Sequence, residues 1–223
     1  MHLKTNNSLT YPTKSRSHPP AASGFWPCST PRTPSADTWL PKKASRFMLL
    51  AEYGPGEGAV VEIGSFLGKS TCWLALGAKA AGREAITAVD YFKPMTFMAT
   101  SEDPMDQAIA KAGSTLPFFK EHIRTFGVED FVSPIVTDSR SAAEAWDGRQ
   151  IRLLFIDGHH EYNSVKTDFS LWSPFVQQGG IIIFHDYCQS WPGVIQFYDE
   201  MMSSTDGYRE LFTCHSMKVV AKS

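Results

Sequence analysis

Short apolar runs alternate with amphipathic stretches through most of this chain. The clearest run, Ile181-Ile182-Ile183-Phe184, is continuously apolar, as in a strand that is buried on both faces. Similar runs at 59–63, 85–89, 131–136 and 152–156 predict the strands that precede it. Apolar residues at helical spacing predict the intervening helices at 70–81, 116–126, 139–146 and 162–172, and a further helix at 194–202.

The two ends of this pattern complete the predicted fold. A helix that Pro41 opens and Gly54 ends comes before the first strand. Two runs at 210–214 and 217–221, with His215-Ser216 between them, predict a closing hairpin. Because strands alternate with helices, we expect an α/β, Rossmann-like, doubly wound sheet. It would have seven strands, mostly parallel, with an antiparallel C-terminal hairpin and a ligand site at the carboxyl ends of the strands.

Two stretches do not fit the pattern. Residues 91–115 have no clean period and carry Pro94 and Pro104, so we predict a lid or substrate loop there. Residues 1–36 are basic, rich in Pro and Ser, and contain no acidic residue. That composition cannot build a core. We therefore predict a disordered or extended tail at 1–36 and one folded domain at 37–223.

Charge and cysteine content narrow the classes of function. A net charge of -2 argues against a nucleic-acid binder that depends on a basic surface. The four cysteines are widely separated and form no Cys-x-x-Cys pair, so neither a zinc site nor a disulfide framework is indicated. No apolar run approaches the ~20 residues of a membrane span. We expect a cytoplasmic protein that binds neither nucleic acid nor a membrane, with homo-oligomerisation left open.

Polar residues follow each predicted parallel strand. The first strand runs into a glycine turn, Gly64-Ser65-Phe66-Leu67-Gly68, whose backbone N–H groups suit the polar part of a nucleotide-like ligand. The carboxyl ends of parallel strands share one edge of a sheet, so we expect the residues that follow the other strands to lie beside this turn. These residues are Asp90, Asp138 with Ser139, Asp157, and His185 with Asp186.

Two nucleotide-handling classes match parts of this pattern. The turn from Gly64 to Ser70 approaches a P-loop but is one residue short, and a phosphate cradle depends on a loop of fixed size. Tyr162-x-x-x-Lys166 matches the catalytic pair of short-chain dehydrogenases, but the glycine fingerprint of that class is absent. Tyr162 and Lys166 are more simply interpreted as a helix start and an exposed lysine.

A third class explains more of the residues. Glu62-x-Gly64-x-x-x-Gly68, with Asp90 at the second strand tip, fits a class I S-adenosylmethionine-dependent methyltransferase, because a carboxylate there accepts both ribose hydroxyls. The chain resembles the branch that holds the macrocin O-methyltransferase and the cephalosporin-hydroxylase-like proteins, distantly related to catechol O-methyltransferase. The segments that carry the resemblance are 61–71, 88–90, 137–139, 154–162 and 179–187.

The resemblance covers roughly residues 39–200 and implies a set of cofactor contacts. The methionine end of S-adenosylmethionine would lie against Gly64 and Ser65. Asp90 would hold the ribose, and Asp157 would lie beside the amino group and the sulfonium. The other implied contacts are Glu62 and Gly68, which shape the turn, Asp138 and Ser139 at the adenine edge, and Phe66 or Tyr91 as a stacking partner.

Methyl transfer to a hydroxyl needs in-line alignment and removal of a proton. Asp157 would lie at the reacting centre, and His160 and His185 are the candidate bases. A divalent cation, Mg²⁺ or another, is the alternative device. By resemblance, Asp157 and Asp186 match the two metal-binding Asp of catechol O-methyltransferase-like enzymes, and His185 would be the third ligand because Tyr187 replaces their Asn. Manganese or zinc would also suit these ligands.

Together these interpretations predict a methyltransferase that acts on a hydroxyl of a small molecule. Two alternatives remain at this stage. The chain could be a P-loop-like nucleotide-binding protein, or a non-catalytic cofactor-binding module on the same fold.

Overall fold

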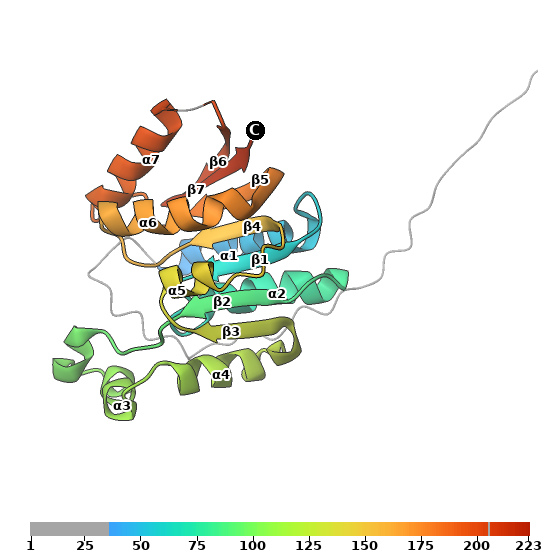
Figure 1. The fold of residues 1–223 in the computed structure, drawn as a ribbon. Coiled ribbons are helices and arrows are strands. Elements are labelled where there is room, and N and C mark those ends of the chain that lie inside the picture. The colour runs from blue at the N-terminus through green and yellow to red at the C-terminus, as the bar shows by residue number, and fades with distance from the viewer. Residues whose placement is uncertain (1–35, 205) are drawn as a thin grey trace, which may run out of the picture. The chain divides into compact units, whose positions relative to one another are not determined.

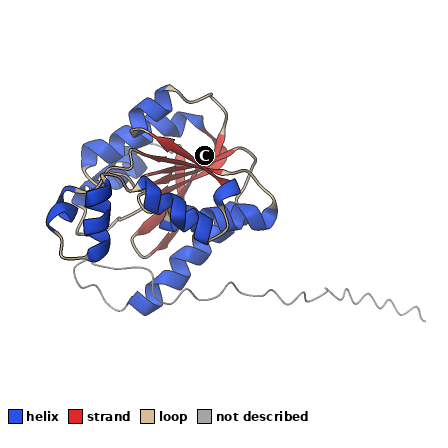
Figure 2. Ribbon diagram, turned by 90° about the horizontal axis from the view of Figure 1, so that it is seen from below, coloured by secondary structure: helices blue, strands red, loops and turns tan. Residues whose placement is uncertain are grey.

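The predicted strands all form and pair in one sheet, which helices cover on both faces (Figures 1 and 2). The computed structural model describes residues 36–204 and 206–223, with side chains from residue 43 onward. The seven strands have the order β3-β2-β1-β4-β5-β7-β6. They are β1 (Ala59–Ile63), β2 (Ile86–Asp90), β3 (Val132–Val136), β4 (Ile151–Ile156), β5 (Val176–Phe184), β6 (Tyr208–Cys214) and β7 (Met217–Lys222).

The pairing confirms the predicted fold class. Strands β1 to β5 pair in parallel, whereas β7 is antiparallel to both β5 and β6. The strand order reverses between β1 and β4, and in open α/β sheets ligands bind at the carboxyl ends of the strands at such a point. The α-helices are α1 (Ala36–Tyr53), α2 (Lys69–Ala81), α3 (Pro104–Ala112), α4 (Leu116–Thr125), α5 (Ser139–Glu144), α6 (Tyr162–Trp172) and α7 (Pro192–Ser204).

Alternation along the strands builds a core on each face of the sheet. Val60 and Leu153 pack in the cluster beneath α1, α2 and α4, whereas their neighbours Val61 and Leu154 pack beneath α5, α6 and α7. All four side chains are fully buried, and full burial of one such side chain is worth about 1.5–3 kcal/mol. Burial on both faces explains why the central strands are continuously apolar in sequence.

The segment 91–115, predicted as a loop, contains a 3₁₀ helix, η1 (Thr96–Thr100), and α3. Asp103 caps α3 by accepting hydrogen bonds from the backbone N–H groups of Met105 (2.7 Å) and Asp106 (3.3 Å). Ile109 is the buried residue of this helix, so its sequence has no apolar period. The role of the segment as a lid stays a prediction.

Several other boundaries differ from the sequence prediction, and three of them have a clear local reason. Helix α1 begins at Ala36, before Pro41. Asp138 rather than Ser139 caps α5, which ends at Glu144. Strand β5 begins at Val176, whereas Gly179-Gly180 in the sequence suggested a turn before the strand. Gly179 adopts a φ of +74°, which lets the strand pass through both glycines. The tail predicted at the N-terminus lies outside the described residues, apart from its last position.

Helix α1 is fixed to the sheet through its C-terminal carbonyl groups. The fully buried Arg152 of β4 donates to the backbone oxygens of Leu50 (3.2 Å) and Ala51 (2.6 Å) and pairs with Glu84. A Cβ at Gly77 of α2 would lie 2.1 Å from the Met48 oxygen, so the two helices meet at backbone distance. These contacts set the register of α1, and therefore decide which of its side chains reach the carboxyl edge of the sheet.

Two shorter 3₁₀ helices, η2 (Glu129–Phe131) and η3 (Ser173–Phe175), lead into β3 and β5. Within the described part of the chain, none of the helices has the length and apolar character needed to cross a membrane.

Candidate active site

The turn after β1 has no room for a side chain at either of its two glycine positions. Gly64 and Gly68 have φ values of +87° and +83°. A Cβ at Gly64 would lie 2.2 Å from the Asp157 carbonyl oxygen, and one at Gly68 would lie 2.9 Å from Cδ2 of Phe119. The turn therefore requires glycine at both positions, and its backbone lies directly against the end of β4.

Glu62 is fully buried beneath this turn. Its carboxylate accepts hydrogen bonds from the hydroxyls of Ser65 (2.8 Å), Ser70 and Thr71. Burial raises the pKa of Glu62 to about 7, although the three hydroxyls act in the opposite direction. The side chain thus ties the turn to the first residues of α2, and a direct contact with a cofactor stays a prediction.

Asp90 at the tip of β2 holds the far side of the turn. Its Oδ2 accepts a hydrogen bond from the backbone N–H of Phe66 (2.8 Å), and its Oδ1 accepts one from Phe92 (2.6 Å). Both donors have positive φ values, +48° and +51°. A carboxylate offers about four acceptor positions, so two remain for a ligand such as a ribose. Tyr91, which is 43% exposed, stacks on the exposed His159.

The residues predicted at the adenine edge have partners inside the protein. Asp138 accepts hydrogen bonds from the Ser141 N–H (2.9 Å) and hydroxyl (2.8 Å), which lower the pKa of the Asp138 carboxyl. The Ser139 hydroxyl accepts from Nε1 of Trp172 at 3.0 Å and bonds to Asp168. Burial raises the pKa of the Asp168 carboxyl. The side chains of Asp138 and Ser139 therefore brace α5 and α6, and adenine contacts stay a prediction.

Two carboxylates and two imidazoles gather where β4 and β5 end. Nε2 of His160 lies 3.5 Å from Oδ1 of Asp157 and 3.2 Å from Oδ2 of Asp186. Nδ1 of His185 lies 3.1 Å from Oδ1 of Asp157 and 3.0 Å from Oδ1 of Asp186. We call these four residues the Asp–His cluster. The sequence analysis placed Asp157, His185 and Asp186 at one edge of the sheet and named His160 as a candidate base. The structure brings all four together.

The charges of the cluster stabilise one another. Burial acts to lower the pKa of His160, but Asp157 and Asp186 outweigh it and raise this pKa to about 9. Burial also acts to lower the pKa of His185, but the negative charge of Asp157 outweighs it and raises this pKa. For both carboxyls, burial acts to raise the pKa, but the two imidazoles hold it below its usual value. The cluster is thus a place where the protein stabilises positive charge between two carboxylates.

Three neighbours of the cluster escaped the sequence analysis. Lys43 of α1 is 3% exposed, and its Nζ lies 2.9 Å from Nε2 of His185. Its Nζ also donates to Oγ of Ser216 at 2.9 Å. The ring of Trp191 stacks on His160, with centroids 4.4 Å apart. Nothing in the spacing of these residues marks them, because each reaches the site only through the packing of α1, the β6–β7 hairpin or the start of α7.

The donor set of the cluster fits a divalent cation. One ligand atom each from Asp157, His160 and Asp186 lies within 4.8 Å of the others. Nε2 of His160 is buried and faces two carboxylates. Its geometry is nevertheless not that of a hydrogen bond to either of them or to any other described residue. Asp186 also has a φ of +56°, a strained conformation of the kind found at functional sites. His160 thus joins the two aspartates in this group. Nδ1 of His185 lies at least as close to both aspartates, so the prediction of His185 as the third ligand stays a prediction.

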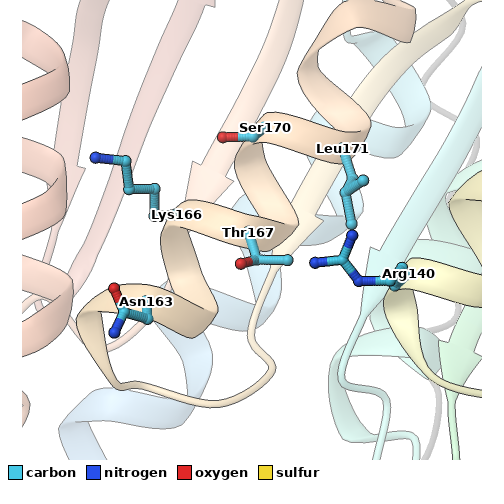
Figure 3. A pocket seen from close by; sticks show the side chains of 6 residues that line it. All are labelled: Arg140, Asn163, Lys166, Thr167, Ser170 and Leu171. Carbon is cyan, nitrogen blue, oxygen red and sulfur yellow. The ribbon is translucent and has the colours of Figure 1, made fainter.

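A separate open groove of about 420 Å³ lies between α5 and α6 (Figure 3). Figure 3 shows Arg140 of α5 opposite one side of α6, and none of the predicted site residues lines the groove. Lys166, on its rim, donates to the Tyr162 hydroxyl at 2.9 Å and pairs with Glu200. The tyrosine and lysine that suggested a dehydrogenase are therefore a surface contact between α6 and α7.

Comparisons with known proteins agree with this geometry. An uncharacterized protein of Acanthamoeba polyphaga mimivirus is 34% identical over 67 residues, which span 30% of this chain and only 27% of the viral protein. The solved structure of the O-methyltransferase NovP matches with a TM-score of 0.66 and 15% identity, over 82% of this chain and 80% of that chain.

An O-methyltransferase from Bacillus cereus, solved in complex with SAH, matches with a TM-score of 0.55 and 18% identity, over 82% of this chain and 81% of that chain. At these identities, the solved structures show a shared fold. A family model described as a methyltransferase domain matches residues 61–187, which is more than half of the chain and includes the glycine turn, Asp90 and the Asp–His cluster. The chain therefore belongs to this methyltransferase domain family.

Proposed function

We propose that this protein transfers a methyl group from S-adenosylmethionine to a hydroxyl group of a small molecule. One observation carries the proposal: the glycine turn, the Asp90 carboxylate and the Asp–His cluster share one edge of the sheet, at the switch point between β1 and β4. The turn and Asp90 suit the cofactor, and the cluster suits a hydroxyl that must lose a proton. The structural neighbours named as O-methyltransferases support the same chemistry.

In this proposal, the cofactor lies along the turn. Its methionine end would contact the backbone of Gly64 and Ser65, with Phe66 beside it, and Asp90 would accept the ribose hydroxyls in the positions its backbone donors leave open. Asp157 lies directly beside Gly64, because the last residues of β1 and β4 pair with each other. The carboxylate of Asp157 would therefore lie near the sulfonium. A negative charge there would hold the positively charged methyl donor in line with the acceptor.

Asp157, His160 and Asp186 would hold the divalent cation. When bound, such an ion lowers the pKa of a coordinated hydroxyl and orients it. Nε2 of His160 is the nitrogen that faces both carboxylates, so this atom either ligates the ion or takes the proton of the acceptor. We assign it the ligand role because His160 belongs to the group whose donor atoms lie within 4.8 Å of one another. His185 is not given the role of base, since both of its ring nitrogens face groups of the protein.

Formation of S-adenosylhomocysteine tests the proposal. The full chain is incubated with S-adenosylmethionine, Mg²⁺ or Mn²⁺, and a panel of phenols, sugars and aliphatic alcohols. We expect turnover with a hydroxyl compound and loss of that turnover with excess chelator or with Asp186→Ala. Turnover confined to thiols or amines would contradict the assignment of the acceptor. Full turnover in excess chelator would remove the ion and make Nε2 of His160 the proton acceptor.

The cytoplasmic location, the lack of a nucleic-acid partner and homo-oligomerisation stay predictions from the sequence. Membership of the methyltransferase family removes the P-loop alternative. The non-catalytic alternative predicts cofactor binding without turnover on any member of the panel, so the same assay distinguishes it.

A further inference from the structure

We propose that His159 is a positioning residue of the cofactor site, which holds the ring of Tyr91 across the glycine turn and so slows the release of a bound cofactor. The inference rests on the proposed function and deepens it, because it adds a residue to the cofactor site that the sequence analysis did not assign. Its test measures cofactor binding alone and needs neither the cation nor the methyl acceptor.

The first step is the origin of the two side chains. Tyr91 directly follows β2, and His159 lies in the loop that follows β4. Strand β1 lies between these two strands in the sheet. Adjacent strands are about 4.8 Å apart, so β2 and β4 are separated by about 10 Å. Side chains that meet from these two strand ends must therefore reach over the end of β1, where the glycine turn begins.

The second step is the contact itself. The two rings stack with their centroids 6.2 Å apart and their planes inclined by 22°. The Tyr91 hydroxyl lies 3.4 Å from Nε2 of His159. A tyrosine hydroxyl can donate or accept a hydrogen bond, so this contact forms with either tautomer of the imidazole. We call these two residues the Tyr91–His159 pair.

The third step is the place of the glycine turn between the two sides of the pair. The backbone N–H of Phe66 donates to Oδ2 of Asp90 at 2.8 Å, and Asp90 directly precedes the tyrosine of the pair. On the other side, a Cβ at Gly64 would lie 2.7 Å from Cα of Gly158, which directly precedes the histidine of the pair. A cofactor that lies along the turn would therefore have one member of the pair on each side.

The fourth step is the depth of these residues. Ser65, within the turn, is 3% exposed, and Asp90 is half-buried. Tyr91 is 43% exposed, and His159 is exposed as well. The pair thus lies on the solvent side of the turn. A ring held there would cover the adenosine part of a cofactor whose ribose binds Asp90, and aromatic rings stack favourably on nucleobases.

The need for a positioning residue follows from how Tyr91 is attached. The next residue, Phe92, is 1% exposed and donates its N–H to Oδ1 of Asp90 at 2.6 Å. The backbone on both sides of Tyr91 is therefore fixed, whereas its exposed ring could rotate about its side-chain bonds. Stacking on His159 restricts that rotation. An aromatic pair of this kind changes an equilibrium or a rate by about 2–10-fold.

The variant His159→Ala tests the inference, with Tyr53→Ala as its control. Tyr53 is an exposed tyrosine that ends α1, next to Gly54, which packs against Arg152 at the start of β4 rather than at its end. The release rate of S-adenosylhomocysteine from the immobilised full chain is measured by surface plasmon resonance. We expect His159→Ala to release it about fivefold faster than wild type, and Tyr53→Ala to release it at the wild-type rate.

A second background gives a readout that a merely structural histidine would not move. If His159 acts through Tyr91, adding His159→Ala to Tyr91→Ala should leave the release rate unchanged. The variants His159→Phe, which keeps an aromatic ring, and His159→Gln, which keeps a group that can bond to the Tyr91 hydroxyl, should between them restore slow release. Equal acceleration by His159→Ala in both backgrounds would overturn the inference, and so would rescue by neither of these two variants.

The two proposals fail in different ways. If wild type binds no S-adenosylhomocysteine, the proposed function is wrong and this inference is wrong with it. If wild type binds it and His159→Ala releases it at the rate of Tyr53→Ala, the proposed function stands and only the positioning role of His159 is wrong.

Discussion

The buried Glu62 carboxyl should make the stability of this protein fall as the pH rises through the weakly acidic range. Its pKa is 4.5 in an unfolded chain and about 7 in the fold, because burial disfavours its charged form. Below pH 4.5 both states hold the proton, so the group has no effect. Between pH 4.5 and about 7, the unfolded chain releases the proton and the folded chain keeps it, so stability declines as the pH rises.

The size of the effect follows from the shift. Each unit of pKa difference corresponds to about 1.4 kcal/mol, so the carboxyl should cost about 3 kcal/mol of unfolding free energy above pH 7 relative to pH 4. Glu62→Gln removes the titration and keeps a polar side chain, whose amide can still exchange hydrogen bonds with the hydroxyls of Ser65, Ser70 and Thr71.

Urea unfolding of wild type and Glu62→Gln between pH 4.5 and pH 8 measures this difference. The stability of the variant relative to wild type should rise by about 3 kcal/mol across this range. Other titrating groups are common to both proteins and cancel. Glu144→Gln, at an exposed position of α5, is the control and should show a flat difference. A flat difference for Glu62→Gln as well would refute the argument from burial.

Three further predictions follow from the turn, the anchor of α1 and the cluster. Gly64→Ala should abolish binding of S-adenosylhomocysteine in calorimetry, since its Cβ would lie 2.2 Å from the Asp157 carbonyl oxygen, whereas Gly82→Ala, where the Cβ meets nothing within 4 Å, should bind normally. Arg152→Met should lower the free energy of urea unfolding by about 3–5 kcal/mol, because Glu84 and two carbonyl groups of α1 lose the fully buried guanidinium group that binds them. A loss below about 1 kcal/mol would contradict this. Mn²⁺ binding should tighten about tenfold per pH unit from pH 7 toward pH 9, because His160, with a pKa of about 9, must release its proton to ligate; affinity independent of pH would exclude His160 as a ligand.

Much of the fold and the location of the site could be predicted from the sequence. The central strands are buried on both faces, so they read as apolar runs, and each ends in a polar residue such as Asp90 or Asp157. Parallel pairing then delivers those residues to one edge. Helix α3 was missed because its signals are a cap at Asp103 and a terminal glycine rather than an apolar period.

The partners within the site could not be predicted in the same way. Lys43 and its neighbour Lys42 are equivalent in the sequence pattern, and it is the packing of α1 against Gly77 and Arg152 that brings Lys43 to His185. His160 and His185 were both candidate bases, and only His185 was predicted as a ligand. The loop after β4 brings Nε2 of His160 toward both carboxylates, a result of loop geometry that residue spacing does not encode.

Calorimetric titration with S-adenosylhomocysteine tests the central claim that the strand ends form one cofactor site. The account predicts micromolar binding by wild type, binding lost in Asp90→Ala, and binding retained in Asp147→Asn, a surface control whose partner is Arg149. Absence of binding to wild type, or equal affinity of wild type and Asp90→Ala, would contradict it.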